Sequence, residues 1–298
     1  MTTGRAPTRT ALWWTAVANL VVNIGIVVTG GAVRLTGSGL GCPTWPRCTD
    51  ESYVPHGELG IHGAIEFGNR LLTFVLVAVA VACWAAALRH AQLRPEGIVR
   101  PWAPFWLATW IALGIPAQAV IGGITVVTDL NPWIVAFHLL VSMAIIAACV
   151  KLLDVLRGPE REAAPPAYRR LAWAILVVGW VVLWLGTVVT GSGPHSGDLH
   201  SRRTGLDPQV VSHVHAWGVY VLVALTLLAV VLARRWALAR LLRVAAVLLG
   251  VELAQGVIGF VQYFTDLPEL LVGIHMLGAA LTSAALTWLV VSAYPRGD

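Results

Sequence analysis

Three histidines inside long apolar segments are the first residues of this sequence that could do chemistry. His138, His215 and His275 each lie a few residues inside such a segment. Histidine is a common axial ligand of haem iron, and two imidazoles on facing helices can hold a haem in the core of a bundle. The alternative is a histidine that only hydrogen-bonds a neighbouring helix. No carboxylate or cysteine stands beside these histidines, which argues against a zinc or di-iron site.

His213 precedes His215 by two positions, so the two side chains point to opposite sides of a helix. We prefer His215 as the inward-facing residue because it lies deeper and is followed by an apolar run. His215 and His275 could then approach a bundle core from opposite sides, which is the arrangement of bis-imidazole haem ligation.

A carboxylate stands at the start of the second apolar segment, in the run Ile65-Glu66-Phe67-Gly68-Asn69-Arg70. Glu66 and Asn69 are three residues apart and share a helix face, with His62 one turn further out. An acidic residue inside a membrane helix is costly, which makes Glu66 a functional candidate. The alternative is that Glu66 pairs with Arg70, four residues on, and holds the helix end. Glu252 raises the same question, and we assign it no role.

The four cysteines fall into two groups. Cys83 and Cys149 lie inside apolar segments and are expected to be packed, reduced thiols. Cys42 and Cys48 lie in the loop after the first segment and could close a short disulfide on an oxidising side of the membrane. Such a disulfide could serve as a loop staple or take part in redox chemistry.

The elements that must position these residues are membrane-spanning helices. The chain is 57% hydrophobic and only 12% charged, whereas soluble domains carry about a quarter charged residues. This composition excludes a disordered chain, a disulfide-rich secreted scaffold and a nucleic-acid-binding domain. Eight segments reach the roughly 20 apolar residues that a span needs: 11–34, 65–88, 103–127, 132–151, 171–191, 209–233, 241–263 and 269–293. The first is too long for a signal-peptide core, so we expect a retained helix.

The basic residues indicate how the helices are oriented. Fifteen of the 20 Lys and Arg residues fall on one side of the predicted spans, in the N-terminal segment, the even-numbered connections and the C-terminal tail. By the positive-inside rule both termini are cytoplasmic, and the net charge of +5 reflects topology rather than a nucleic-acid partner. Two long, Gly- and Pro-rich loops, 35–64 and 192–208, then lie outside and are expected to cap a site. On the cytoplasmic side we count Arg5, Arg9, Arg89, Arg94, Arg100, Lys151, Arg157, Arg161, Arg169, Arg170, Arg234, Arg235, Arg240, Arg243 and Arg296.

The two halves of the chain contain an internal repeat. Residues 117–140 align with 254–277 without a gap, at a constant offset of 137, and 11 of 24 positions are identical. The identities include a Thr-Asp-Leu motif and the pair His138/His275. We therefore predict an all-α polytopic membrane protein of two pseudo-symmetric four-helix bundles, 1–157 and 158–298, related by an axis along the membrane normal.

The chain resembles the haem A synthases along essentially its whole length. The most specific part runs from Thr36-Gly37-Ser38-Gly39 through Gly41-Cys42 to Trp45-Pro46-Arg47-Cys48. The motif from Ile65-Glu66 to Arg70, together with His138, His215 and His275, also matches the family pattern. The resemblance implies an eight-helix membrane oxidoreductase that converts haem O to haem A. It would oxidise the methyl at ring position 8 to a formyl through a hydroxymethyl intermediate, for cytochrome c oxidase cofactor biosynthesis.

The resemblance also implies residue roles. His215 and His275 would hold a haem b in the C-terminal bundle, and His138 would face the iron of the substrate haem in the N-terminal bundle, near Asn69 and Arg70. Glu66 would be the essential carboxylate that handles protons or stabilises a cationic intermediate. The Cys42–Cys48 pair matches an outer-loop pair that transfers reducing equivalents or shapes the site.

The chain departs from the family pattern at two places. Many members carry histidine where this chain has Asn69, so we expect the substrate haem to be five-coordinate through His138 or to bind water opposite it; His62 is a less favoured substitute ligand. Some members have a second cysteine pair in the loop between helices five and six, and this chain has none between Gly191 and Pro208.

The expected partners are haem O, the haem O synthase that supplies it, a membrane electron donor and the lipid bilayer, with homo-oligomerisation left open and no nucleic acid. The site is expected near the extracytoplasmic side of the cell membrane. The first alternative is a di-haem cytochrome that carries electrons from quinol without modifying haem, which leaves Glu66 and the difference between Asn69 and His215 unexplained. The second is a transporter, whose polar site should lie at the midplane rather than at the outer helix ends.

Overall fold

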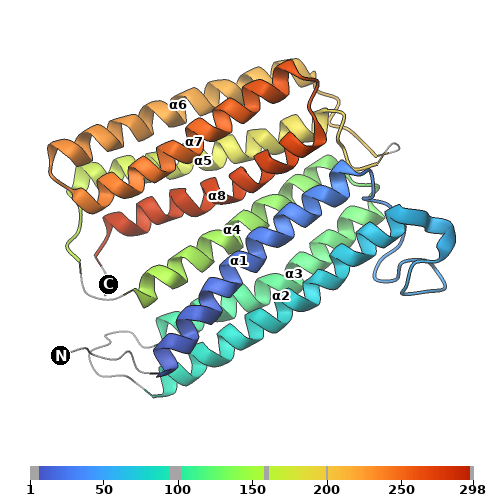
Figure 1. Ribbon diagram of the computed structural model, residues 1–298, viewed down its shortest axis with the longest axis horizontal. Coiled ribbons are helices and arrows are strands. Elements are labelled where there is room, and N and C mark those ends of the chain that lie inside the picture. Colours follow the sequence, from blue (N-terminus) through green and yellow to red (C-terminus); the bar gives the residue numbers. More distant parts are fainter. Residues whose placement is uncertain (1–6, 94–101, 158–160, 199–200, 296–298) are drawn as a thin grey trace.

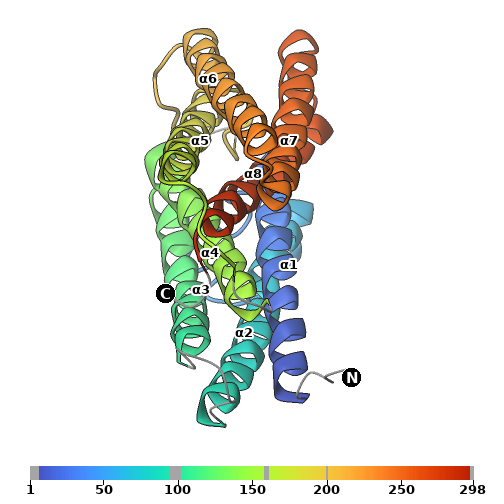
Figure 2. The ribbon, with the colours of Figure 1, turned by 90° about the vertical axis from the view of Figure 1, so that its left-hand side faces the viewer.

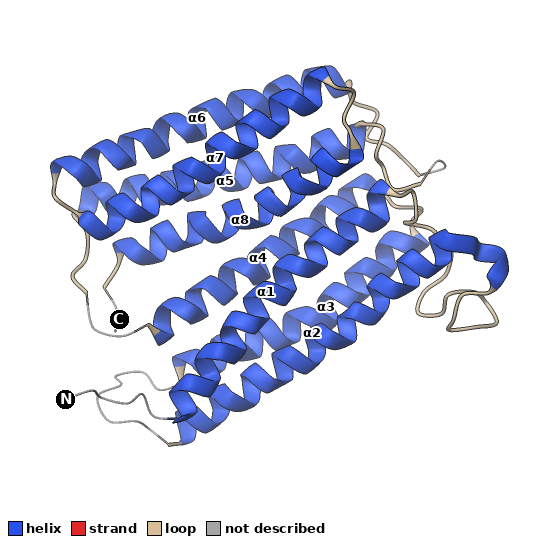
Figure 3. Cartoon of the chain, viewed as in Figure 1, coloured by secondary structure: helices blue, strands red, loops and turns tan. Residues whose placement is uncertain are grey.

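The computed structural model describes residues 7–93, 102–157, 161–198 and 201–295. Within these ranges the chain forms long helices and one short 3-10 helix, with no strand (Figures 1 and 3). Eight of the helices in this part of the chain are long and apolar enough to cross a membrane. The protein is therefore an all-α, multi-pass membrane protein. The elements are α1 (Pro7–Leu35), η1 (Gly57–Leu59), α2 (Gly60–Gln92), α3 (Ala103–Val127), α4 (Pro132–Leu156), α5 (Pro166–Ser192), α6 (Pro208–Arg235), α7 (Ala239–Phe264) and α8 (Glu269–Ala293).

All eight predicted spans are present, and several helices extend past the apolar segments. Helix α2 begins at Gly60 rather than near residue 65, so the predicted irregular loop 35–64 is shorter than expected. Helix α4 continues to Leu156, and α5 begins at Pro166. The sequence marks only the hydrocarbon-facing part of each helix, whereas backbone hydrogen bonding continues into the interfacial region, where charged side chains can reach water.

The helices form two rings of contacts. In the first half α1 packs on α2, α2 on α3, α3 on α4, and α4 back on α1; helices α5 to α8 repeat this order. The two rings meet where α4 contacts α5 and α8, and where α1 contacts α8 (Figure 2). At this junction the Ser283 hydroxyl donates to the Met143 carbonyl at 3.0 Å. A pseudo-two-fold relation between the rings remains a prediction.

The repeated Thr-Asp-Leu motif forms the same turn in both halves. Asp129 and Leu130 have φ values of 52° and 54°, and Asp266 and Leu267 have φ values of 56° and 58°. The Leu130 amide donates to the Thr125 carbonyl at 2.8 Å, and the Leu267 amide bonds at the matching offset, to the Gln262 carbonyl at 3.0 Å. Two successive left-handed residues that are not glycine are unusual, since this conformation costs about 1–2 kcal/mol per residue. Each turn reverses the chain just before the helix that carries a candidate histidine.

Capping residues set where α4 and α6 begin. The Asn131 side chain accepts from the Trp133 amide, and the Asp207 side chain accepts from the Gln209 and Val210 amides. Proline follows each cap at the first helical position, where its missing N–H costs nothing. These starts place His138 and His215 about two turns inside their helices.

Helix α1 begins and α8 ends at the same end of the molecule, and the two long loops lie at the other end (Figure 1). The assignment of the first end to the cytoplasm rests on the basic residues and remains a prediction. Arg5, Arg94, Arg100 and Arg296, which contribute to it, lie outside the described residues.

Candidate functional site

Glu66 lies in the second turn of α2 and is bound from two sides. The residue is only 5% exposed. Its Oε1 accepts from Arg70 Nη2 at 2.5 Å, which is the i, i+4 ion pair considered from the sequence. Its Oε2 accepts from the Cys42 backbone amide at 2.7 Å. The carboxylate therefore joins the helix to the outer loop. The ion pair with Arg70 is present, but it is not the only contact that the carboxylate makes.

Arg70 gathers the outer loop over this end of α2. Its guanidinium donates to the backbone carbonyls of Cys42, Thr44 and Arg47, each at 3.1 Å. Carbonyl acceptors and the Glu66 carboxylate together compensate the cost of holding this charge at the edge of the membrane. The Glu66–Arg70 pair is thus the anchor on which the loop is folded.

The loop between α1 and α2 is closed by the predicted disulfide. Cys42 and Cys48 are bonded to each other, and both residues are 0% exposed. Between them, the Trp45 ring packs directly on the Cα of Gly123 in α3. The loop thus reaches from Glu66 on α2 to the residue beside Gly122 on α3. Cys83 and Cys149 are free and buried, as expected.

Gly41 provides a test of this loop packing. A Cβ at Gly41 would overlap the backbone carbonyl of His62, which cannot move without shifting the start of α2. We expect Gly41→Ala to lower the free energy of unfolding by about 1–3 kcal/mol, the usual cost of overpacking. Thermal unfolding of the purified protein measures the loss. Gly57→Ala, where a Cβ meets nothing within 4 Å, is the control and should unfold like the unchanged protein; equal stability of both variants would contradict the packing.

Each candidate histidine lies against a glycine of the helix that precedes it. A Cβ built on Gly122 of α3 would lie 3.2 Å from Cε1 of His138, and one on Gly186 of α5 would lie 3.4 Å from Cε1 of His215. A Cβ on Gly259 of α7 would lie 3.7 Å from Cε1 of His275. Only the contact at Gly122 is tighter than an ordinary van der Waals contact, whereas a Cβ at Gly186 or Gly259 would meet its imidazole at ordinary contact distance. All three histidines are half-buried.

Asn69 has a similar position in the remaining helix pair. Its amide Nδ2 lies 4.0 Å from a Cβ built on Gly30 of α1, and its Oδ1 accepts from the Thr29 hydroxyl at 2.8 Å. The side-chain carbonyl oxygen of Asn69 is therefore hydrogen-bonded to Thr29, which leaves its amide N–H groups as donors. The four helix pairs thus carry three histidines and one asparagine beside glycines.

The hydrogen bonds of the three imidazoles differ. Nδ1 of His215 bonds the Val182 carbonyl at 3.1 Å, which assigns the proton to Nδ1 and leaves Nε2 as the basic nitrogen. Nδ1 of His138 and Nδ1 of His275 are buried without a hydrogen-bond partner. Beside His138, Gln118 donates to the His138 backbone carbonyl at 2.9 Å and also to the Ser142 hydroxyl. Gln255, its partner in the repeat, packs against Gly278.

Two other histidines lie apart from these positions. His213 is exposed and bonds the Tyr263 hydroxyl at 3.3 Å. His62 is exposed and bonds the Ser38 hydroxyl at 2.9 Å, so it ties the outer loop to the start of α2.

Glu252 is buried in the middle of α7, where it is 3% exposed. Its Oε1 accepts from the Thr226 hydroxyl at 2.9 Å, and its Oε2 has no partner. This hydrogen bond links α7 to α6, and we assign Glu252 no functional role.

The outer loops of the two halves meet above the helices. Arg34, at the end of α1, donates to the backbone carbonyls of His195 at 2.6 Å and Thr190 at 3.1 Å. The Gly39 amide donates to the Gly197 carbonyl at 2.9 Å. The Met276 side chain, next to His275, packs against Gly31, next to Gly30. The two histidine-bearing halves are therefore in direct contact.

The residues present fit a haem better than a metal ion held by several side chains. Among the described residues no group of three or more His, Cys, Asp or Glu side chains gathers as a metal site. A haem iron takes at most two axial ligands from the protein. His275, with an unpartnered ring nitrogen, and His215, polarised by a carbonyl, have the donor chemistry of such a pair.

Comparison with known proteins decides the family. A family model described as cytochrome oxidase assembly protein matches residues 12–194. The chain belongs to this family, the haem A synthases. A haem A synthase from Geobacillus kaustophilus is 32% identical over 113 residues, which are 38% of this chain and 32% of the relative. One from a Bradyrhizobium species is 30% identical over 214 residues, 60% of this chain and 56% of the relative.

A haem A synthase from Methylorubrum populi is 29% identical over 237 residues, 70% of this chain and 60% of the relative. The matches thus span about a third to three fifths of the length of these haem A synthases. The family match covers the outer loop, Glu66, Asn69 and His138, and ends before His215 and His275.

The sequence alone did not identify several residues around the haem A synthase motifs. In the sequence Trp45 is only one residue of a motif, and its contact with Gly123 depends on the path of the loop. Thr29 holds Asn69 through a contact between residues 40 positions apart. Gly122 and Gly259 occupy matching positions of the repeat, at the same offset of 137, and this identity is the sequence signal that marks them.

Proposed function

We propose that this chain is a haem A synthase that oxidises the methyl group at ring position 8 of haem O to a formyl group, through a hydroxymethyl intermediate, for cytochrome c oxidase assembly. It would then be an oxidoreductase acting on a CH group. The observation that carries the proposal is the set of glycine-backed positions, which present His138, His215 and His275 from three helix pairs and Asn69 from the fourth.

The two halves would have different tasks. The C-terminal part, 158–298, would hold a haem b through Nε2 of His215 and through His275. When bound, this haem supplies one-electron transfer at a potential set by its ligands and surroundings. The N-terminal part, 1–157, would take up the substrate with His138 on the side of its iron. Asn69 and Arg70 would contact the substrate from α2.

Glu66 would handle the protons released as the methyl group is oxidised. A carboxylate held by one amide and one guanidinium keeps a defined position, which general acid–base catalysis requires. The Cys42 amide donates to Glu66, so the disulfide would act as a staple: by fixing Cys42 it would keep the Glu66 carboxylate in place. Both cysteines are 0% exposed, which favours the staple over exchange with an external reductant.

The basic end of the helices would face the cytoplasm, so the site would lie near the extracytoplasmic side of the cell membrane. The substrate would reach it from the bilayer, supplied by a haem O synthase, and a membrane electron donor would be the redox partner.

Pigment analysis tests the function. Haem extracted from cells that express this chain together with a source of haem O should contain haem A or its hydroxylated precursor. Recovery of unmodified haem O alone, from cells in which the full chain is present in the membrane, would contradict the proposal.

We expect Asn69 to stand at the position from which a second histidine would bind the substrate haem iron, opposite His138. Gly30 leaves room beside residue 69, so Asn69→His should place an imidazole there and convert the substrate haem to a six-coordinate, low-spin form. Absorption and electron paramagnetic resonance spectra of the purified protein loaded with haem O measure the change. Asn69→Leu, of similar size but without a ligand atom, is the control. An unchanged spectrum for Asn69→His would show that α2 does not face His138.

A further inference from the structure

A cavity of about 250 Å³ lies at the end of the molecule opposite the candidate site. It is formed where the first two turns of α7, the last two turns of α8 and the residue after α4 come together. Its walls combine cationic, aromatic and hydroxyl groups: Arg157, Arg240, Arg243, Val244, Trp288 and Ser292.

The cavity concentrates positive charge. Three arginines line it, and none of the acidic residues in the described part of the chain does. Arg157 stacks on two indole rings, 5.6 Å from that of Trp13 and 5.8 Å from that of Trp288. Arg240 donates to the Ser292 carbonyl. Guanidinium groups held near one another repel, and an anion between them removes that cost.

The hydroxyl group of Ser292 also indicates an anionic ligand. Ser292 is 4% exposed, and its Oγ is buried without a hydrogen-bond partner. A buried hydroxyl without a partner costs about 1–3 kcal/mol. A buried helical serine often donates to the backbone carbonyl four residues earlier, but the Ser292 hydroxyl does not make this bond. Ser292 is one of the residues that line the cavity, so a change of its side-chain rotamer would let this hydroxyl, as well as the arginines, donate to an oxyanion there.

The position of the cavity indicates where the anion comes from. It lies at the ends of membrane-spanning helices, beside Trp13 and Trp288, at the depth where aromatic side chains meet lipid headgroups. Val244 and Trp288 supply an apolar wall against which the glycerol part of a lipid could lie. We propose that this cavity binds the phosphate group of an anionic membrane phospholipid.

The bound phosphate would join the two helix rings. Arg157 follows α4 of the first ring, whereas Arg240, Arg243 and Ser292 belong to α7 and α8 of the second. One anion contacting all of them bridges the rings at the end away from the outer loops. Basic pockets between helices on the cytoplasmic side are typical sites for such headgroups. This inference does not depend on the proposed enzymatic function.

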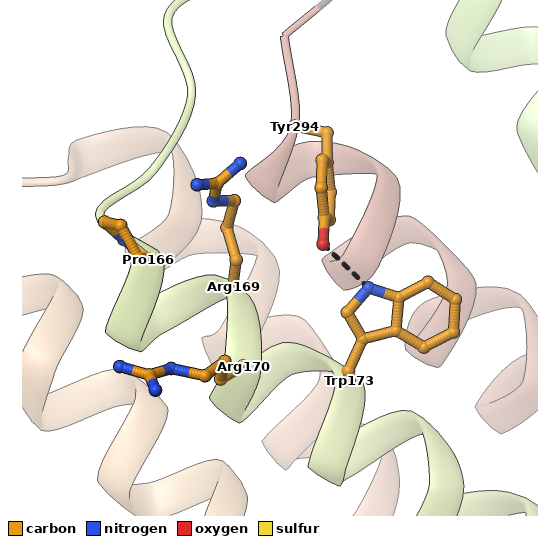
Figure 4. Close-up of a pocket in the computed structure, with 5 residues that line it drawn as sticks. All are labelled: Pro166, Arg169, Arg170, Trp173 and Tyr294. Atoms are coloured by element: carbon orange, nitrogen blue, oxygen red, sulfur yellow. Dashed lines mark hydrogen bonds between the residues drawn. The ribbon is translucent and has the colours of Figure 1, made fainter.

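A second, more open cavity of about 650 Å³ provides a matched comparison. It is lined by Pro166, Arg169, Arg170, Trp173 and Tyr294 (Figure 4). Here the polar groups of the aromatic side chains bond each other, since the Trp173 indole donates to the Tyr294 hydroxyl at 2.8 Å. Arg169 stacks over the Tyr294 ring, and Arg170 points away from both rings. No lining hydroxyl is left without a partner, so this cavity carries no proposal.

The test compares lipid retention by two variants with the same loss of charge. The full chain is reconstituted in nanodiscs of equal parts phosphatidylcholine and phosphatidylglycerol, and lipids that remain bound are counted by native mass spectrometry. Arg157→Gln/Arg243→Gln should retain phosphatidylglycerol about 30-fold less well, from about 1 kcal/mol for each arginine. Arg169→Gln/Arg170→Gln should retain it like the unchanged protein. Equal losses in both variants, or none in either, would overturn the proposal.

Two further measurements keep the test decisive. If the double variant does not fold, Ser292→Ala, which keeps all charges, should still lower retention; unchanged retention would overturn the site. Protein in phosphatidylcholine alone is also heated with short-chain phosphatidylglycerol or with inorganic phosphate. The lipid should raise the melting temperature more than phosphate does at equal concentration. An equal rise with phosphate would assign the cavity to a soluble anion, and no rise with either would refute it.

Discussion

Replacing His275 or His215 by alanine is expected to remove the low-spin b-type haem spectrum of the purified protein. Each imidazole would supply one of two axial bonds, and a low-spin iron needs both. Because the loss of even a supporting contact lowers metal affinity about 10- to 100-fold, loss of a ligand should reduce haem content at least as much. Reduced-minus-oxidised absorption spectra and the haem content per chain measure the effect.

His213→Ala is the matched control. His213 lies two positions from His215 on α6, but it is exposed and contacts Tyr263. Its removal should leave the spectrum unchanged. Circular dichroism and gel filtration establish that the variants keep their helical structure. An intact low-spin spectrum in both His215→Ala and His275→Ala would refute the ligand assignment.

Glu66→Gln is expected to keep bound haem and to lower formation of haem A by about 100-fold or more. General acid–base groups contribute about 10²–10⁴-fold to rates, and an amide cannot exchange a proton in this way. The glutamine carbonyl can still accept from the Cys42 amide, so the outer loop should stay folded. Haem extraction measures product, and the absorption spectrum measures bound haem.

Arg70→Gln separates proton handling from the structural ion pair. It removes the partner of Glu66 and the donors to the Cys42, Thr44 and Arg47 carbonyls, while the carboxylate remains. If the pair only holds the helix end, Arg70→Gln should be at least as harmful as Glu66→Gln. If Glu66 handles protons, Glu66→Gln should be the more damaging of the two at equal stability. Normal turnover by Glu66→Gln would reduce the residue to an anchor of the loop.

The sequence alone determined the membrane class, the eight spans and the disulfide partners. A 20-residue apolar segment has essentially one stable state in a bilayer, a helix, because its backbone groups must bond within the segment. The Cys42–Cys48 pairing followed from local spacing on one loop. The repeat also placed His138 and His275 in matching positions, because the identical residues that flank them build the same turn.

Only the tertiary structure decided which groups these residues contact. Whether Glu66 pairs with Arg70 or serves the site could not be read from spacing, and the structure shows that it bonds both Arg70 and the Cys42 amide. Thr29 reaches Asn69, and Trp45 reaches Gly123, through contacts between residues distant in the chain. Apolar periodicity identifies a helix but carries almost no information about which helix lies beside it. That choice is made by side-chain packing, and it places His138, His215 and His275 each against a glycine of the preceding helix.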